Sequence, residues 1–289
     1  MPPKEPDFPD RDDLPKESAR TILFQFVIFP LGIVVIAVGV FLLFGKLASD
    51  EQSIPDYLNE IRSGSSHERW QAAYQLSKSL KRGEAKRYPN LEQQVAAIYV
   101  AAKNDDPRIR RYLSMVLGSL GDRKATPLLV DALNEKDIDT RIYALLALAD
   151  LRDPASVPAV MTAAHDDEKD VRKTALYTLG SIGDRRASDL LASELTDETA
   201  DVRYNAAVAL ARMGDPRAIG VLREMLDRNR LNHVRDMRED QKEEAMIVAI
   251  NAYTRLAGKS ASPDLVRLTH DPNLSVAVAA KDALAHLPH

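Results

Sequence analysis

The feature that most constrains the fold of this chain is an internal repeat of 31 residues. Gly-Asp-Arg turns such as LGSLGDRKA (117–125) and LGSIGDRRA (179–187) recur along the sequence. A fixed period in this range is typical of a solenoid, in which each repeat packs mainly on its neighbours. The residues that keep the 31-residue interval are Asp122, Asp153, Asp184 and Asp215, Arg110, Arg141, Arg172 and Arg203, and Leu117, Leu148, Leu179 and Leu210.

Each repeat predicts a short first helix, as in 126–134, and a longer second helix with apolar residues at helical spacing, as in 170–183. Gly121, Gly183 and Gly214 follow second helices, where a left-handed C-cap residue belongs. The aspartate after each glycine can cap the next first helix. We therefore interpret the Gly-Asp-Arg turn as the end of one helix joined to the start of the next, and not as a catalytic loop.

The end repeats depart from the pattern, as capping repeats of a solenoid do. Arg69 is followed by the next repeated arginine only after 41 residues, which indicates a ten-residue insertion around 81–90. A second insertion falls in 226–244, which mixes both signs of charge and is interpreted as a solvated loop or a helix extension. Ile247 stands where the next repeated arginine is expected. About seven helix pairs are expected in all.

The repeat resembles the HEAT-like repeats of the phycobilisome lyase type. The matching residues are the Asp-x-Arg tripeptides at 139–141, 170–172 and 201–203, each followed by an alanine-rich helix and Gly-Asp or its variant. The resemblance covers roughly residues 51–289 and implies an all-α fold, a right-handed α-solenoid. It also implies a structural ladder of Asp and Arg side chains. The ladder residues are Arg110, Arg141, Arg172 and Arg203, with Asp139, Asp170 and Asp201.

Two alternatives accompany this resemblance. An arginine row that binds phosphates or an acidic peptide is disfavoured, because the repeated arginines fall on the apolar side of their helices. The lyase relatives attach bilins, so the resemblance also admits a bilin lyase-type enzyme or a chromophore-handling protein. The repeat alone does not carry that activity, and a bound chromophore in the purified protein would distinguish the two functions.

The N-terminal segments differ in composition from the repeats. Residues 1–20 contain five prolines and ten charged residues, which predicts a disordered tail. Residues 21–44 carry no charge, and a helix of this length spans about 35 Å, enough to cross a membrane. A cleavable signal peptide is the alternative, but its apolar region would be about 7–15 residues. The predicted domains are a tail (1–20), a transmembrane helix (21–45) and a repeat domain (46–289).

Basic residues near the apolar segment predict its orientation. Lys16 and Arg20 precede it closely, whereas only Lys46 follows closely. Because lysine and arginine favour the cytoplasmic side, the repeat domain is expected outside the cell membrane, on the periplasmic side. The cytoplasmic side remains the alternative.

A partner surface can be located by numbering each second helix from its repeated arginine, taken as position 0, at 100° per residue. Positions 3, 4, 7 and 10 gather with the arginine and predict the core. Positions 2, 5 and 9 point away, toward the concave face that second helices line in HEAT-like solenoids. Tyrosine and methionine at such positions favour a protein interface, although packing between neighbouring helices is an equal alternative. The predicted partner-binding residues, the concave ridge, are Tyr74, Tyr112, Met115, Tyr143, Leu146 and Tyr177.

The sequence offers no convincing set of catalytic residues. The chain has no cysteine, which excludes disulfides and thiolate metal sites, and none of its six histidines lies in a zinc-binding motif. Residues 21–289 carry 35 basic and 37 acidic side chains, so charge gives no reason to expect nucleic acid. We predict a non-enzymatic, single-pass membrane scaffold or accessory subunit of a membrane complex, with a protein partner and without metal or cofactor.

Overall fold

The computed structural model describes residues 28–48, 53–80, 87–235 and 237–287. The predicted tail (1–20) and the first part of the predicted transmembrane helix (21–27) lie outside the described residues. The chain divides into two compact units, Met1–Ser53 and Ile54–His289, and each is described by itself.

Helix α2 (Phe29–Ala48) is the described element of the N-terminal unit. Its described apolar side chains are largely exposed, and the exposed fraction of Phe41 reaches 76%. Among the residues whose side chains are described, no helix is long and apolar enough to cross a membrane.

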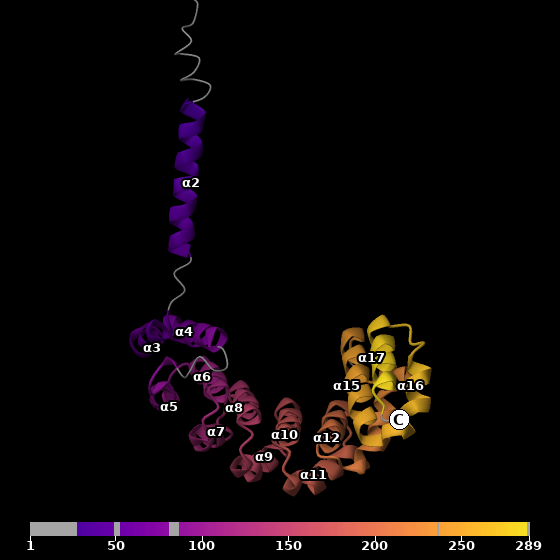
Figure 1. Cartoon of the computed structure of the whole chain (residues 1–289). Helices are drawn as coiled ribbons and strands as arrows, with labels where there is room; N and C mark the ends of the chain where they lie inside the picture. The colour runs from indigo at the N-terminus through magenta and orange to yellow at the C-terminus, as the bar shows by residue number, and fades with distance from the viewer. Residues whose placement is uncertain (1–27, 49–52, 81–86, 236, 288–289) are drawn as a thin grey trace, which may run out of the picture. The chain divides into compact units, whose positions relative to one another are not determined.

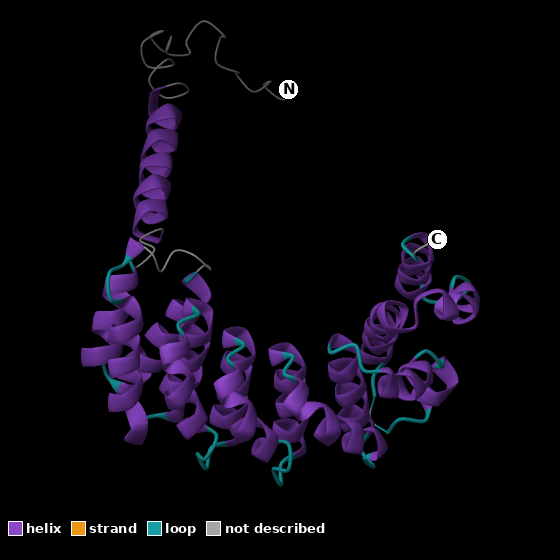
Figure 2. Ribbon diagram, turned by 60° about the horizontal axis from the view of Figure 1, so that its bottom comes forward, coloured by secondary structure: helices purple, strands orange, loops and turns teal. Residues whose placement is uncertain are grey.

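The C-terminal unit consists of helix pairs that follow one another along an arc (Figures 1 and 2). Its described residues contain no strand, so the all-α solenoid is confirmed, and they form seven pairs. The pairs are α3 (Ile54–Ser63) with α4 (Ser66–Ser79), α5 (Leu91–Ala101) with α6 (Pro107–Leu120), α7 (Thr126–Ala132) with α8 (Ile138–Leu151), α9 (Val157–Ala163) with α10 (Lys169–Ile182), α11 (Ser188–Ser193) with α12 (Ala200–Arg212), α13 (Ile219–Met225) with α15 (Glu239–Ala257), and α16 (Ser262–Leu268) with α17 (Leu274–Ala285).

The turns between pairs have the predicted caps. Gly121, Gly183 and Gly214 adopt φ values of 75–76°, the left-handed region that glycine enters without steric cost. Each following aspartate accepts a backbone N–H two residues on; Asp184 Oδ1, for example, accepts from the amide of Arg186 at 2.9 Å. These caps open short 3-10 helices that lead into the first helices, such as η7 (Arg185–Ala187) before α11. The recurring Gly-Asp-Arg turn is therefore a structural joint.

Two glycines let neighbouring second helices approach closely. A Cβ atom added at Gly180 of α10 would lie 2.6 Å from Ala209 Cβ and 2.7 Å from Ala209 Cα of α12. A Cβ added at Gly118 of α6 would lie 2.9 Å from Ala147 Cα of α8. The intervening neighbours, α8 and α10, are joined by a hydrogen bond in which the Thr178 hydroxyl of α10 donates to the carbonyl oxygen of Leu145 of α8 at 3.0 Å. Small residues and one buried hydrogen bond thus set the spacing of the inner helices.

The second insertion is ordered around a short helix, α14 (Arg228–Asn232), and an extended N-terminus of α15. Arg228 Nη2 lies 2.6 Å from Asp271 Oδ1, and the Asp271 side chain is only 6% exposed. Lys242, on the first turns of α15, is also buried and donates to Asn232 Oδ1 at 3.1 Å. The predicted helix extension is present, and the insertion is attached to the last helix pair. Residues 81–86 of the first insertion lie outside the described part.

Candidate partner-binding surface

The inner side of the arc is lined by second helices. In Figure 1, α6, α8, α10 and α12 lie on the inner side, and α7, α9 and α11 lie on the outer side. The core residues of the second helices point toward the first helices; in α10 these include Ala175, Leu176 and Leu179, all fully buried. Positions 2, 5 and 9 lie on the opposite side of each second helix, and their occupants in α6, α8, α10 and α12 reach the surface except Thr174 of α10, which is buried.

Every residue of the concave ridge reaches the surface. Tyr177 is exposed at 40%, and the other five ridge residues are half-buried. Among the ridge residues, only Tyr112 packs against the buried core cluster. Apart from Tyr112, the ridge therefore lies outside the core cluster, and Tyr74 and Tyr143 each contact the Tyr112 ring.

An aromatic run extends across the first three second helices. The ring centroids of Tyr74 and Tyr112 are 5.1 Å apart, and those of Tyr112 and Tyr143 are 6.0 Å apart, both with edge-to-face geometry. Trp70 joins the run at 6.4 Å from Tyr112. We call Trp70, Tyr74, Tyr112 and Tyr143 the aromatic run. Its rings form one continuous surface, because each contacts a ring of an adjacent helix.

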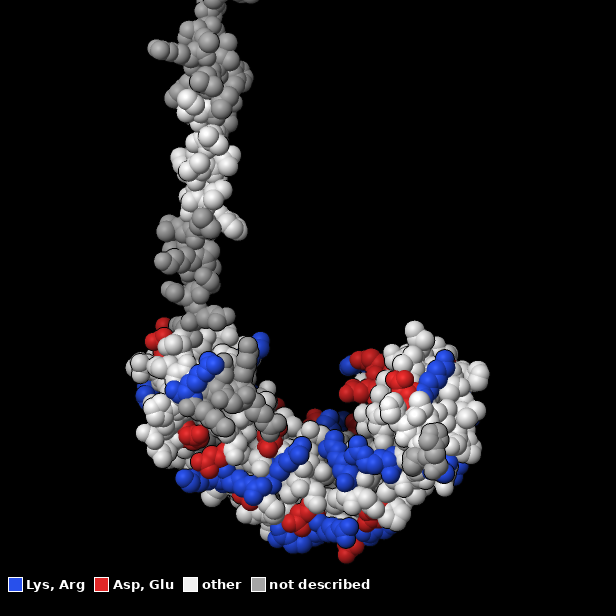
Figure 3. Space-filling model, in the orientation of Figure 1, with Lys and Arg blue, Asp and Glu red and all other residues white. Residues whose placement is uncertain are grey.

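Cationic side chains cover part of this surface. The Arg108 guanidinium lies 4.3 Å from the Trp70 ring centroid, and Lys78 Nζ lies 4.6 Å from that of Tyr74. Further along the arc, Arg212 lies 5.2 Å from the Tyr177 ring. Both signs of charge occur over the C-terminal unit in the face shown in Figure 3. The sequence analysis missed Trp70 and Arg108, although the only tryptophan of the chain, directly after Arg69, was an available signal.

The tyrosine hydroxyls fall into two groups. The buried tyrosines use their hydroxyls within the fold: Tyr99 with Ser114 at 3.2 Å, and Tyr253 with Asp264 at 3.0 Å. Tyrosines that reach the surface make no hydroxyl hydrogen bond to a described residue, and this holds both on the ridge (Tyr74, Tyr112, Tyr143 and Tyr177) and away from it (Tyr57 and Tyr88), where the hydroxyls are open to water. Burial raises the pKa of Tyr143, with further contributions from Tyr112 and Asp139, so its hydroxyl is protonated and able to donate at neutral pH.

The repeated arginines lie between successive helix pairs. Arg141 Nη1 donates to the carbonyl oxygen of Glu135 in its own loop at 2.9 Å, and its Nη2 lies 3.0 Å from Asp166 Oδ1 of the next pair. Arg110 pairs in the same way with Glu135 and is only 5% exposed. Arg203 and Arg172 also donate to carbonyl oxygens of their own loops. These contacts connect the loops of neighbouring repeats.

The acidic half of the predicted ladder is wrong. Asp139 Oδ2 pairs with Arg111 Nη1 at 2.8 Å, Asp170 pairs with Lys173 Nζ at 2.8 Å, and Asp201 is exposed. The reason is helical geometry, since residues two apart on a helix do not face each other. In Asp-x-Arg the arginine points to the core side and the aspartate points toward the concave side. The acidic partners are instead the loop residues Asp105 (for Arg69), Glu135 (for Arg110) and Asp166 (for Arg141), and Glu224 of α13 (for Arg203).

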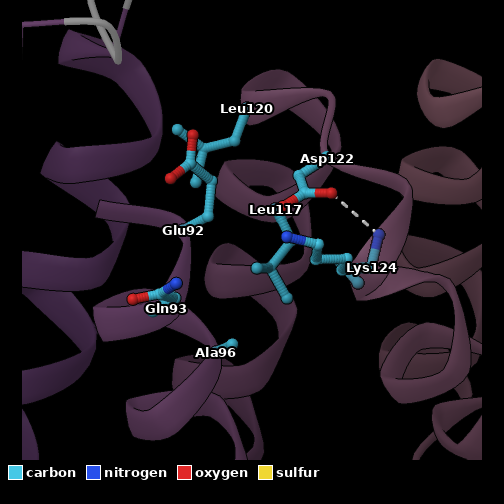
Figure 4. Close-up of a pocket in the computed structure, with 8 residues that line it drawn as sticks. Glu92, Gln93, Ala96, Leu117, Leu120, Asp122 and Lys124 are labelled. Carbon is cyan, nitrogen blue, oxygen red and sulfur yellow. Dashed lines mark hydrogen bonds between the residues drawn. The ribbon is translucent and has the colours of Figure 1, made fainter. Parts of the chain in front are cut away.

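The hollows of the C-terminal unit are small or polar. The pocket in Figure 4 lies between α5 and α6 and is lined by Glu92, Ala96 and Leu120 among others; its volume of about 70 Å³ is too small for most organic ligands. A polar groove of about 830 Å³ runs between the N-terminal ends of α10 and α12 and the insertion. No group of three or more metal-binding side chains occurs in the described part of the chain.

The comparisons with known proteins agree with this architecture. A sequence profile described as HEAT repeats matches residues 95–172, 126–201 and 161–239, which together cover half of the chain. The chain therefore belongs to the HEAT-repeat family. Among curated proteins, none matches the sequence.

The solved structures that this chain resembles are distant from it in sequence. The complex of CpcE and CpcF of phycocyanin lyase from Nostoc sp. PCC7120 is 20% identical, with a TM-score of 0.55, over 83% of this chain and 97% of that chain. YibA of Escherichia coli is 16% identical, with a TM-score of 0.49, over 83% and 90% of the two chains. An engineered protein is also 16% identical, with a TM-score of 0.44, over 80% and 94%. At these identities the likeness to the lyase complex concerns the fold alone.

Proposed function

We propose that the protein is a non-enzymatic scaffold, or accessory subunit of a membrane complex, that binds a partner protein through its concave ridge. The observation that carries this proposal is the set of four ridge tyrosines. All four reach the surface, and three of them, Tyr74, Tyr143 and Tyr177, are not packed against the buried core cluster, whereas Tyr112 is. Tyrosine combines a large apolar ring with a polar hydroxyl, which suits a surface that contacts a partner in the complex and water in the free protein.

The second part of the proposal is attachment to a membrane through residues 21–45. The uncharged sequence and the exposed apolar side chains of α2 support it, because an exposed apolar surface of this extent is normally covered by lipid or protein. The repeat domain is proposed to lie on the periplasmic side. Extraction of the full chain from membranes by alkaline carbonate would contradict the anchor. Protection from added protease until the inner membrane is lysed would reverse the orientation.

The partner-binding part is tested by changing Tyr143 and Tyr177 together to alanine in the full chain. Capture of the partner protein from gently solubilised native membranes should weaken by at least about tenfold, because buried interface aromatics commonly contribute about 2 kcal/mol or more. Val266→Ala, on the outer helix α16 where the side chain is 53% exposed, is the control and should leave capture unchanged.

Thermal stability separates binding from packing. The tyrosine double variant should melt close to the unchanged protein, because its rings lie above the core. If instead it loses as much stability as Arg172→Ala, the tyrosines serve helix packing and the ridge is not a binding surface.

A further inference from the structure

We propose that the C-terminal end of the solenoid binds the same end of a second copy of this chain, through helix α17, in a two-fold symmetric contact. Helix α17 lies at the C-terminal end of the arc (Figure 1). The surface involved, which we call the end face, consists of Leu274, Val278, Lys281 and Ala285. It is separate from the concave ridge, so this inference does not depend on the proposed function.

The packing of the inner helices shows which side of a second helix meets the next one. Gly180 at position 8 of α10 approaches Ala209 at position 6 of α12, and Gly118 and Ala147 do the same in α6 and α8. Position 8 therefore faces the following second helix. Positions −3, 1 and 4 lie within about 40° of position 8 around the helix, since each residue advances about 100°. These four positions form the side on which the next helix pair stacks.

The end face holds these four positions in α17. The repeated arginine is absent from α17, so its positions are counted from the N-cap residue. In α10 and α12 the N-cap lies four residues before position 0. The N-cap of α17 is Asn273, which makes Ala277 position 0 and places the end face at positions −3, 1, 4 and 8.

The stacking side is covered in α12 and open in α17. In α12, Tyr204, Ala207 and Ala211 at positions 1, 4 and 8 are at most 5% exposed, because the pair of α13 and α15 packs against this helix. In α17, Leu274 is 76% exposed and Val278 is 44% exposed. No other large apolar side chain described in the C-terminal unit is as exposed as Leu274. The end face is thus a stacking surface of the solenoid without a helix over it.

The other end of the solenoid does not match this surface. The side of α4 that faces away from α6 carries Glu68 and Gln75 at positions −1 and 6, and both are exposed. A polar outer side is what a capping repeat has. A head-to-tail contact would therefore place the apolar end face against a polar surface. Contact between like ends is isologous and closes as a dimer.

The end face is complementary to itself in shape. Its residues follow one another at intervals of four, three and four, which aligns them in one stripe along α17. In an antiparallel pair about a two-fold axis through the middle of the stripe, Leu274 lies opposite Ala285 of the second copy. Val278 likewise lies opposite Lys281, whose aliphatic stem can cover it. Each large apolar side chain thus meets a small residue or a flexible stem.

The charges on α17 favour the same arrangement. Lys281 and Asp282 are exposed and form no ion pair with a described residue. They do not pair with each other, since consecutive residues of a helix do not face each other. In the antiparallel pair, Asp282 of the second copy lies level with Ala277, about 6 Å along the helix axis from Lys281. Two equivalent Lys281–Asp282 ion pairs therefore form between the copies.

The association is tested on the full chain by sedimentation equilibrium in a density-matched detergent. The contact involves one helix about 18 Å long, which is small for a stable interface, so we expect a reversible dimer with a Kd below about 100 µM. Leu274→Gln should weaken the dimer by at least about tenfold, because each dimer buries two copies of this side chain. The control is Val100→Gln on α5, where the side chain is 56% exposed, and it should leave the Kd unchanged. Equal melting temperatures would show that both variants fold.

Exchanging the two charges tests the orientation of the copies. Lys281→Asp and Asp282→Lys should each weaken the dimer by about three- to tenfold, because each places like charges across the contact. The double variant that carries both changes restores opposite charges and should bind within about threefold of the unchanged protein. Rescue has to come from contact between copies, since the two residues do not face each other within one helix.

Three results would overturn the inference. The first is a chain that stays monomeric at about 100 µM. The second is a dimer that Leu274→Gln leaves unchanged, which would place the association elsewhere, for example in α2. The third is a double charge variant as weak as the single variants, which would exclude the antiparallel two-fold contact. None of these results bears on capture of a partner by the ridge.

Discussion

Gly180 offers the sharpest test of how the inner helices pack. A methyl group at this position would lie 2.6 Å from Ala209 Cβ and 2.7 Å from Ala209 Cα, closer than real Cβ contacts allow. One of these atoms belongs to the backbone of α12, so a side-chain rotation cannot relieve the contact. Gly180→Ala must therefore push α10 and α12 apart.

The magnitude can be isolated with a second glycine. Overpacking of this kind costs about 1–3 kcal/mol, but alanine also stabilises a helix interior by about 1 kcal/mol relative to glycine. Gly220 in α13 is helical and has no atom within 4 Å of an added Cβ. Gly220→Ala, at the second residue of α13, therefore gains helical preference without the steric cost, and the difference between the two variants reports mainly the steric cost.

The assay is thermal unfolding of both variants, followed by circular dichroism at the helical band. For a domain of this size, 1 kcal/mol shifts Tm by about 2–4 °C, so Gly180→Ala should melt about 3–10 °C below Gly220→Ala. Gly220→Ala itself should melt at or slightly above the unchanged protein. If Gly180→Ala melts as high as Gly220→Ala, the close approach of α10 and α12 is wrong.

Three further predictions concern charged residues. Arg172→Ala should lower Tm by several degrees, since charge-assisted hydrogen bonds contribute about 1.5–3 kcal/mol each, whereas Arg185→Ala at an exposed turn should not. Burial raises the pKa of Asp137, but its hydrogen bonds outweigh burial and lower the pKa to about 2. The ionised Asp137 should therefore stabilise the fold at neutral pH, and this stability should be lost as the pH falls from about 4 toward 2. The Tm difference between Asp137→Asn and the unchanged protein should shrink over that range. Arg228→Gln should leave the buried Asp271 carboxylate unpaired, so limited proteolysis within 226–238 should become faster, and unchanged proteolysis would contradict attachment of the insertion to the last pair.

Much of the fold follows from the sequence because the repeat is encoded locally. A glycine at a helix end and an aspartate one residue later determine where helices stop and start, and both act within one turn of the backbone. The left-handed conformation of Gly121 and Gly183 was predictable for that reason. Arg152 occupies the equivalent glycine position and also adopts positive φ, which shows that the surrounding turn can impose the conformation on another residue.

Contacts between distant loops could not be predicted in the same way. The partner of Arg141 is Asp166, 25 residues away, and the orientation of both loops decides that pairing. The resemblance to a known family implied a ladder that includes Asp139, but Asp139 lies on the concave side of its helix and pairs with Arg111. Likewise, the Arg228–Asp271 pair joins the insertion to a repeat 43 residues away, and no period relates the two positions.

The ridge illustrates where functional information lies in a repeat protein. Positions that build the solenoid keep the same residue type from repeat to repeat, as Leu117, Leu148, Leu179 and Leu210 do. Position 2, in contrast, changes along the arc from aromatic residues in α6 and α8 to threonine and asparagine in α10 and α12. Burial does not explain this change alone, because Tyr143 and Asn205 are both partly exposed, whereas Thr174 is buried and Tyr112 packs against the core cluster. The aromatic run concentrates aromatic contact with a partner in the first three pairs, so Tyr112→Ala should weaken partner capture more than Tyr177→Ala.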